Sequence, residues 1–100
     1  MRKARIDANQ PEIVKALRAA GATVQSLATI GCGCPDLLVG FRGQTVLMEV
    51  KDGAKPPSQR RLTEDEQKWH STWNGGALAI VDSVEAALRA INIIRPNEPV

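Results

Sequence analysis

Cysteine, histidine and aromatic residues are scarce in this 100-residue sequence. It has two cysteines, Cys32 and Cys34, a single histidine, His70, and no tyrosine, and aromatic residues make up 3% of the chain. Two cysteines separated by one glycine are too few and too close for the disulfide framework of a secreted domain, and one histidine leaves a structural zinc site without its fourth ligand. Because catalysis by a Cys–His or Ser–His–Asp arrangement is equally unsupported, we assign His70 no catalytic role.

Long hydrophobic runs are also absent. No apolar stretch approaches the roughly 18 to 20 residues that a membrane-spanning helix requires. The N-terminus is basic, but polar residues follow where a signal peptide would need an apolar segment. We therefore expect no membrane partner and a cytoplasmic location. The chain length and the 43% of hydrophobic residues predict one domain, residues 1–100, with one core.

The net charge is small, with 13 basic and 11 acidic residues. Any affinity for nucleic acid must therefore come from local clusters of basic residues. One cluster is formed by Arg2, Lys3 and Arg5. A second is the segment 51–61, whose only acidic residue is Asp52 and whose basic residues are Lys51, Lys55, Arg60 and Arg61. Glycine and proline in this segment predict a mobile loop, whose charge is explained either by exposure to solvent or by contact with phosphate groups.

Hydrophobic periodicity and turn residues predict three helices and four strands. The first helix begins near Pro11, has an apolar face that includes Ile13 and Leu17, and ends at Gly21. Strands are predicted over 23–27, 36–39, 45–51 and 77–81. The second helix follows a capping box formed by Thr63 and Glu66 and ends at Gly75, and the third begins after residue 82 or 83.

The predicted order is helix, three strands, helix, strand, helix, which indicates a small α/β or α+β sandwich. The strands are almost continuously apolar, so we expect both faces of the sheet to be covered. Trp69 and Trp73 are spaced to share one face of the second helix. That spacing favours packing in the core over stacking on unpaired bases.

The hairpin turn at Arg42 and Gly43 predicts an unusual pair of charges. With these two residues at the centre of the turn, Asp36 faces Glu49 across the hairpin. Directly opposed residues have β-carbons about 4.5 to 5.5 Å apart, where two like charges are destabilising. Two carboxylates among aliphatic residues therefore require a compensating cation, and a divalent metal ion is the natural one.

Lys51 adds a basic group to this acidic pair. Strand alternation places it on the same face as Glu49. Two carboxylates that hold a metal ion beside an ammonium group suit metal-assisted hydrolysis of a phosphodiester, in which Lys51 orients the attacking water or stabilises the developing charge. The alternative is a salt bridge at the end of the sheet.

These residues resemble the PD-(D/E)XK nuclease signature and, in the wider pattern, its small VRR-NUC branch. The resemblance rests on Pro35-Asp36 after a glycine-rich turn and on Glu49-Val50-Lys51, with Glu12 in the first helix and Gln67 and Trp69 in the second. It implies a restriction-endonuclease-like three-layer core, a mixed sheet with the Asp36/Glu49 hairpin at its centre, and a Mg²⁺- or Mn²⁺-dependent nuclease related to Holliday-junction resolvases. Several such proteins are short phage products, for which the location would be the host cytoplasm.

Matched to this pattern, six positions receive a role. Asp36 and Glu49 would be metal ligands, the carbonyl of Val50 a further ligand, Lys51 the catalytic lysine, Glu12 an additional acid and Gln67 a site residue from the second helix. Glu12 is also explained by the helix dipole, and Gln67 by solvent exposure. The pattern does not require Cys32 and Cys34, which leaves redox sensitivity open.

The expected function is therefore that of an endodeoxyribonuclease selective for branched or four-way-junction DNA, with Lys55, Arg60 and Arg61 as DNA contacts. Cutting both strands needs two sites at a fixed separation, which favours a homodimer. Its interface would use surplus apolar residues, namely Trp73, Ile91, Ile93 and Ile94. The alternative is a non-catalytic DNA-binding or assembly subunit with a nuclease-like fold.

Overall fold

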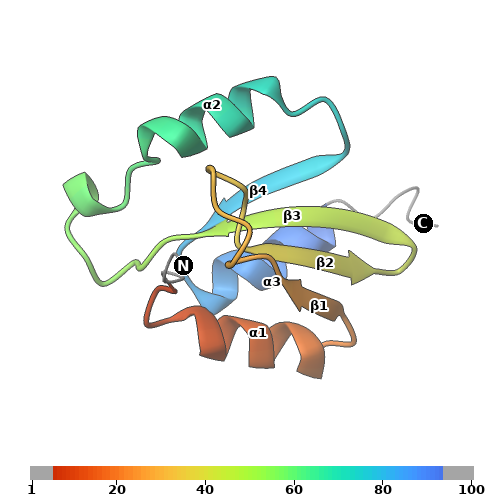
Figure 1. The fold of residues 1–100 in the computed structure, drawn as a ribbon. Coiled ribbons are helices and arrows are strands. Elements are labelled where there is room, and N and C mark those ends of the chain that lie inside the picture. The colour runs from red at the N-terminus through yellow and green to blue at the C-terminus, as the bar shows by residue number, and fades with distance from the viewer. Residues whose placement is uncertain (1–5, 94–100) are drawn as a thin grey trace.

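A computed structural model describes residues 6–93 as three α-helices, a short 3-10 helix and a four-stranded sheet (Figure 1). The elements are α1 (Gln10–Ala19), β1 (Thr23–Ser26), β2 (Leu37–Phe41), β3 (Gln44–Val50), η1 (Pro57–Gln59), α2 (Glu64–Thr72), β4 (Ala77–Val81) and α3 (Val84–Ile93). The sheet order is β1-β2-β3-β4, with β4 parallel to β3 and the other pairs antiparallel. The predicted order of elements and the mixed sheet are confirmed.

Helices α1 and α3 cover one face of the sheet, and α2 stands over the other (Figure 1). The hydrophobic core lies on the first face, where alternate strand residues meet the apolar sides of the two helices. Its largest fully buried apolar side chains include Ile13, Leu17, Leu37, Met48 and Ile91. The core therefore holds β2 and β3 rigidly from one side and leaves their other side available.

The start of α1 is tied to the strand ends near which the charged pair was predicted. Asn9 is the residue before the helix, but its side chain does not cap it. The Asn9 amide instead donates to the carbonyl oxygens of Lys51, at 3.0 Å, and of Asp82, at 3.2 Å. These bonds fix the chain directly after β3 and β4 against the first helix.

The second face of the sheet is covered less than predicted. Helix α2 contributes no buried residue, and Leu38 and Ile80 on its side of the sheet are 38% and 53% exposed. Trp69 and Trp73 stack on each other, with ring centroids 5.1 Å apart, and Trp73 is 40% exposed. The prediction that they join the core is wrong, because a helix standing clear of the sheet has the same spacing of apolar residues as one packed on it.

Two expectations about the ends of the chain have different outcomes. Ile91, predicted at a subunit interface, is buried in the core. The side chain of Ile93, the whole of Ile94, and the basic cluster of residues 2, 3 and 5 lie outside the described residues. Among helices within residues 6–93, none has the length and apolar character needed to cross a bilayer.

Candidate functional site

The hairpin formed by β2 and β3 has the predicted register. Leu37 pairs with Met48 and Phe41 with Gln44, so the next pair beyond Leu37 is Asp36 with Glu49. The turn is of type I′, because Arg42 and Gly43 both have positive φ, of 51° and 78°. This turn sets which residues oppose each other along the hairpin, and it therefore brings the two carboxyl groups together.

Asp36 is held in place by the backbone on both sides. Its carboxylate accepts a hydrogen bond of 2.7 Å from the Val50 backbone N–H, and its carbonyl accepts one of 2.7 Å from the Leu27 N–H. Burial is the largest cause of a raised pKa of Asp36, although the Val50 N–H acts in the opposite direction. One Asp36 carboxylate oxygen therefore anchors the end of β3, beside the Glu49 side chain.

Glu49 is the most buried charged residue among the described residues, with 2% of its surface exposed. Its Oε1 atom is buried and has no hydrogen-bond partner; the nearest basic nitrogens are His70 Nε2, at 3.6 Å from Oε1, and Lys51 Nζ, at 4.0 Å from Oε2. Burial, the adjacent Asp36 carboxyl group and the charge of Glu66 raise the pKa of Glu49 to about 10. Loss of the proton from Glu49 is therefore unfavourable unless a cation lies beside its carboxyl group.

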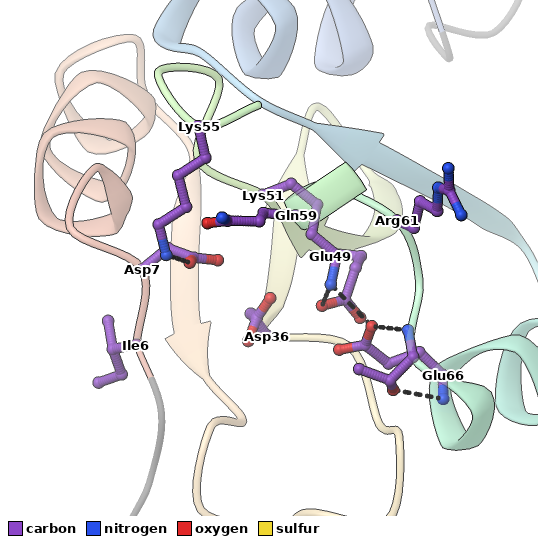
Figure 2. Close-up of a pocket in the computed structure, with 10 residues that line it drawn as sticks. Ile6, Asp7, Asp36, Glu49, Lys51, Lys55, Gln59, Arg61 and Glu66 are labelled. Atoms are coloured by element: carbon purple, nitrogen blue, oxygen red, sulfur yellow. Dashed lines mark hydrogen bonds and ion pairs between the residues drawn. The ribbon is translucent and has the colours of Figure 1, made fainter. Parts of the chain in front are cut away.

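Lys51 lies between two carboxylates. Its Nζ donates to Glu66 Oε1 at 2.7 Å and is 4.0 Å from Glu49 Oε2 (Figure 2). Glu66 comes from the first turn of α2, where the predicted capping box with Thr63 is present. Although burial acts to raise it, the pKa of Glu66 is lowered by Lys51 and by the Thr63 N–H.

These groups line one pocket of about 610 Å³. Its residues are Ile6, Asp7, Asp36, Glu49, Lys51, Lys55, Gln59, Arg61, Thr63 and Glu66 (Figure 2). The predicted acid, acid and lysine are thus together at the ends of β2 and β3. The segment before α1, the basic loop and the start of α2 supply the rest of the wall.

The chemistry of Asp36 and Glu49 fits a hard divalent cation. A buried carboxylate oxygen without a partner, next to a second carboxylate, is the donor set that Mg²⁺ or Mn²⁺ takes together with water and phosphate oxygens. Within residues 6–93, no three acidic, histidine or cysteine side chains converge as a ligand group. The protein would therefore supply two carboxylates, and solvent or substrate would complete the coordination.

The basic loop residues take different positions. Lys55 and Arg61 line the pocket, and Lys55 pairs with Asp7 at 3.7 Å (Figure 2). Arg60 is absent from the pocket lining and pairs with Asp82 at 3.7 Å. Two of the three residues predicted to contact DNA therefore line the pocket that contains the acidic pair, and the third is paired with another part of the chain.

Glu12 and Gln67 do not line this pocket. Glu12 is exposed and lines a separate cavity of about 490 Å³ with Asp52 and Asp82. Gln67 is exposed, and its amide donates to the Leu62 carbonyl at 3.2 Å. The chain before α1, and not the helix, borders the pocket, and its Asp7 pairs with Lys55.

The sequence pattern missed the roles of Asp7 and Glu66 at the pocket. The capping box accounts for Glu66 in the first turn of α2, and the same geometry turns its side chain back towards the chain before the helix. This direction of the side chain is the signal from which the approach of Glu66 to the pocket could have been predicted. Asp7 carries no comparable signal in the sequence.

Comparison with known proteins supports the fold. No family model and no curated protein matches the sequence. A solved structure of a VRR_NUC domain matches with a TM-score of 0.63 and 24% sequence identity, covering 89% of this chain and 100% of that one. Residues 6–93 therefore have the nuclease-like α/β fold of a VRR_NUC domain.

Proposed function

We propose that this protein is a Mg²⁺- or Mn²⁺-dependent endodeoxyribonuclease whose active site is formed by Asp36, Glu49 and Lys51. The observation that carries the proposal is the buried, unpartnered Glu49 oxygen beside Asp36 and Lys51 in one pocket. An unpaired buried carboxylate is costly to fold, so its presence favours a function that uses it. The VRR_NUC-like fold supports the same conclusion.

Each residue of the site has a distinct task in this proposal. Asp36 and Glu49 would hold the metal ion, with the Val50 carbonyl as a further ligand. When bound, the ion supplies Lewis-acid activation of water and of the phosphodiester. Lys51 orients the attacking water or neutralises charge on the phosphate, because its ammonium group lies 4.0 Å from Glu49.

Lys55 and Arg61 would guide the DNA backbone to the pocket. Both line it, and both are exposed. Contacts from lysine and arginine to phosphate position DNA without reading its sequence. This suits an enzyme that selects branched or four-way-junction DNA by shape. In that proposal, Arg60 would contact DNA only after leaving Asp82.

A homodimer would provide the two sites that a junction or both strands of a duplex require. The outer edge of β4 is the surface that best supports it. The strand Ala77–Val81 has no proline and no charge, Ile80 is 53% exposed, and a cavity of about 330 Å³ runs between this strand and α3. An open apolar edge of this kind favours pairing with another strand.

A non-catalytic DNA-binding or assembly subunit is the second candidate. It is favoured by the way the charges compensate one another without metal. Lys51 pairs with Glu66, and Glu49 has a pKa raised to about 10 by burial. In this case, DNA binding would not depend on a divalent ion.

A cleavage assay separates the two candidates. Linear, flapped and four-way-junction DNA are incubated with the protein in Mg²⁺, Mn²⁺ or EDTA. The nuclease proposal expects cleavage with metal, none in EDTA, and a loss of at least about 100-fold in Glu49→Ala. Glu85→Ala, which removes an exposed acid outside the pocket, is the matched control and should cleave normally. Binding without cleavage in either metal would favour the subunit.

A further inference from the structure

One oxygen of Glu66 serves two donors that belong to different parts of the site. Glu66 Oε1 accepts from the Thr63 backbone N–H at 2.8 Å and from Lys51 Nζ at 2.7 Å (Figure 2). The first bond closes the capping box of α2, and the second crosses to the residue after β3. The same carboxylate therefore joins the start of the helix to the proposed catalytic lysine.

The position of Glu66 is fixed by more than this pair of bonds. The Thr63 hydroxyl accepts from the Glu66 N–H at 3.2 Å. Gly33, with φ of 83°, packs so closely on the backbone of Asp65 and Glu66 that a β-carbon there would collide with it. The turn that leads into Asp36 thus supports the same helical turn that carries Glu66.

The distances show which carboxylate holds the ammonium group. Lys51 Nζ is 2.7 Å from Glu66 and 4.0 Å from Glu49. A direct charged hydrogen bond is formed at the first distance but not at the second. If the charge of Glu66 were removed, the carboxyl group left beside the ammonium group, at 4.0 Å, would be that of Glu49 at the end of β3.

The geometry points to Glu66 as a positioning residue: it holds Lys51 away from Glu49 and so keeps the Glu49 carboxylate open to a divalent metal ion. This inference rests on the proposed metal site and adds to it a residue that acts through Lys51. Losing the charge of Glu66 lets Lys51 pair with Glu49 and compete with the ion. The affinity for the metal ion then falls because Lys51 occupies the Glu49 carboxylate.

A double-mutant cycle on Mn²⁺ binding tests this inference. Titration calorimetry with Mn²⁺ alone is carried out on the wild type, Glu66→Gln, Lys51→Met and the double variant. Glutamine keeps the capping-box acceptor while it removes the charge, so the helix should be retained. Glu64→Gln, in the same turn but outside the pocket, controls for loss of an acid at the helix start.

We expect Glu66→Gln to raise the Kd for Mn²⁺ by about tenfold in the wild-type background and by about threefold or less when Lys51 is methionine. The effect that remains when Lys51 is methionine measures the direct electrostatic attraction between Glu66 and the ion. Glu64→Gln should leave the Kd within about twofold. Equal effects of Glu66→Gln in both backgrounds would overturn the positioning role while leaving the metal site intact. No Mn²⁺ binding by the wild type would overturn the proposed function, and this inference with it.

Discussion

The two faces of the sheet have opposite character. On the α1 and α3 side, β3 presents Val46, Met48 and Val50, all essentially inaccessible to solvent. On the α2 side, the same strand presents Leu47 and Glu49, and its neighbours β2 and β4 expose Leu38 and Ile80. Packing on the first face stabilises the fold. The second face carries buried charge that lowers the free energy of unfolding, and the packing of the first face must offset this loss. Stability and proposed function are therefore separated by alternate residues of one strand.

The largest expected effect is a loss of stability on substitution in the packed face. Met48→Ala leaves a cavity in the core and should lower the free energy of unfolding by about 2 to 5 kcal/mol. Leu38→Ala, on the exposed face, should lower it by less than about 1 kcal/mol. Urea denaturation followed by circular dichroism measures both. Similar losses in the two variants would show that the faces do not differ as described.

The next largest effect is expected for dimer formation, on substitution at the edge strand β4. Ile80→Lys places a charge on the proposed interface, where an unpaired buried charge is unfavourable, and should weaken a dimer by more than about tenfold. Light scattering at micromolar concentration should give twice the 10.8 kDa chain mass for the wild type and a smaller mass for the variant. A wild-type mass of 10.8 kDa, with nicking of only one strand, would contradict the dimer.

The acidic pair should make the metal-free protein less stable as the pH rises. Burial raises the pKa of Glu49 from 4.5 to about 10, so between these values the folded state binds more protons than the unfolded state. Stability therefore falls with increasing pH over this window. Glu49→Gln should flatten this dependence, and thermal denaturation at several pH values in EDTA measures it. An equally steep fall in Glu49→Gln would assign the dependence to other groups.

The smallest expected effect concerns the basic loop. Lys55→Ala with Arg61→Ala should reduce the salt slope of DNA binding by about two units, one for each lost phosphate contact. Adding Arg60→Ala should change it by about one unit more only if Arg60 leaves Asp82 to contact DNA. Gel-shift titrations over a range of salt concentrations measure the slopes. An unchanged slope in the double variant would remove this loop from the DNA interface.

Short-range rules account for what the sequence predicted well. The register of β2 and β3 follows from a turn of two residues, Arg42 and Gly43, and the start of α2 follows from a capping box spanning four residues. Both features are local. The turn places Asp36 opposite Glu49, and the capping box places Glu66 in the first turn of α2.

Long-range placement was beyond the same rules. The approach of Glu66 to Lys51 depends on where α2 lies, and so does the exposure of Trp73. Neither the spacing of apolar residues nor the cap specifies that position. The border formed by Asp7 likewise depends on how the chain enters α1, which no motif in the sequence indicates.

A crystal structure of the protein soaked in Mn²⁺, with anomalous differences recorded to locate the ion, would show whether Asp36 and Glu49 bind a metal ion. We expect a peak in the pocket within coordination distance, about 2.1 Å, of carboxylate oxygens of both Asp36 and Glu49. Glu49→Gln crystals should lose it. An empty pocket at saturating Mn²⁺, or a peak only at the separate cavity lined by Glu12, Asp52 and Asp82, would contradict the assignment of Asp36 and Glu49 as a metal site.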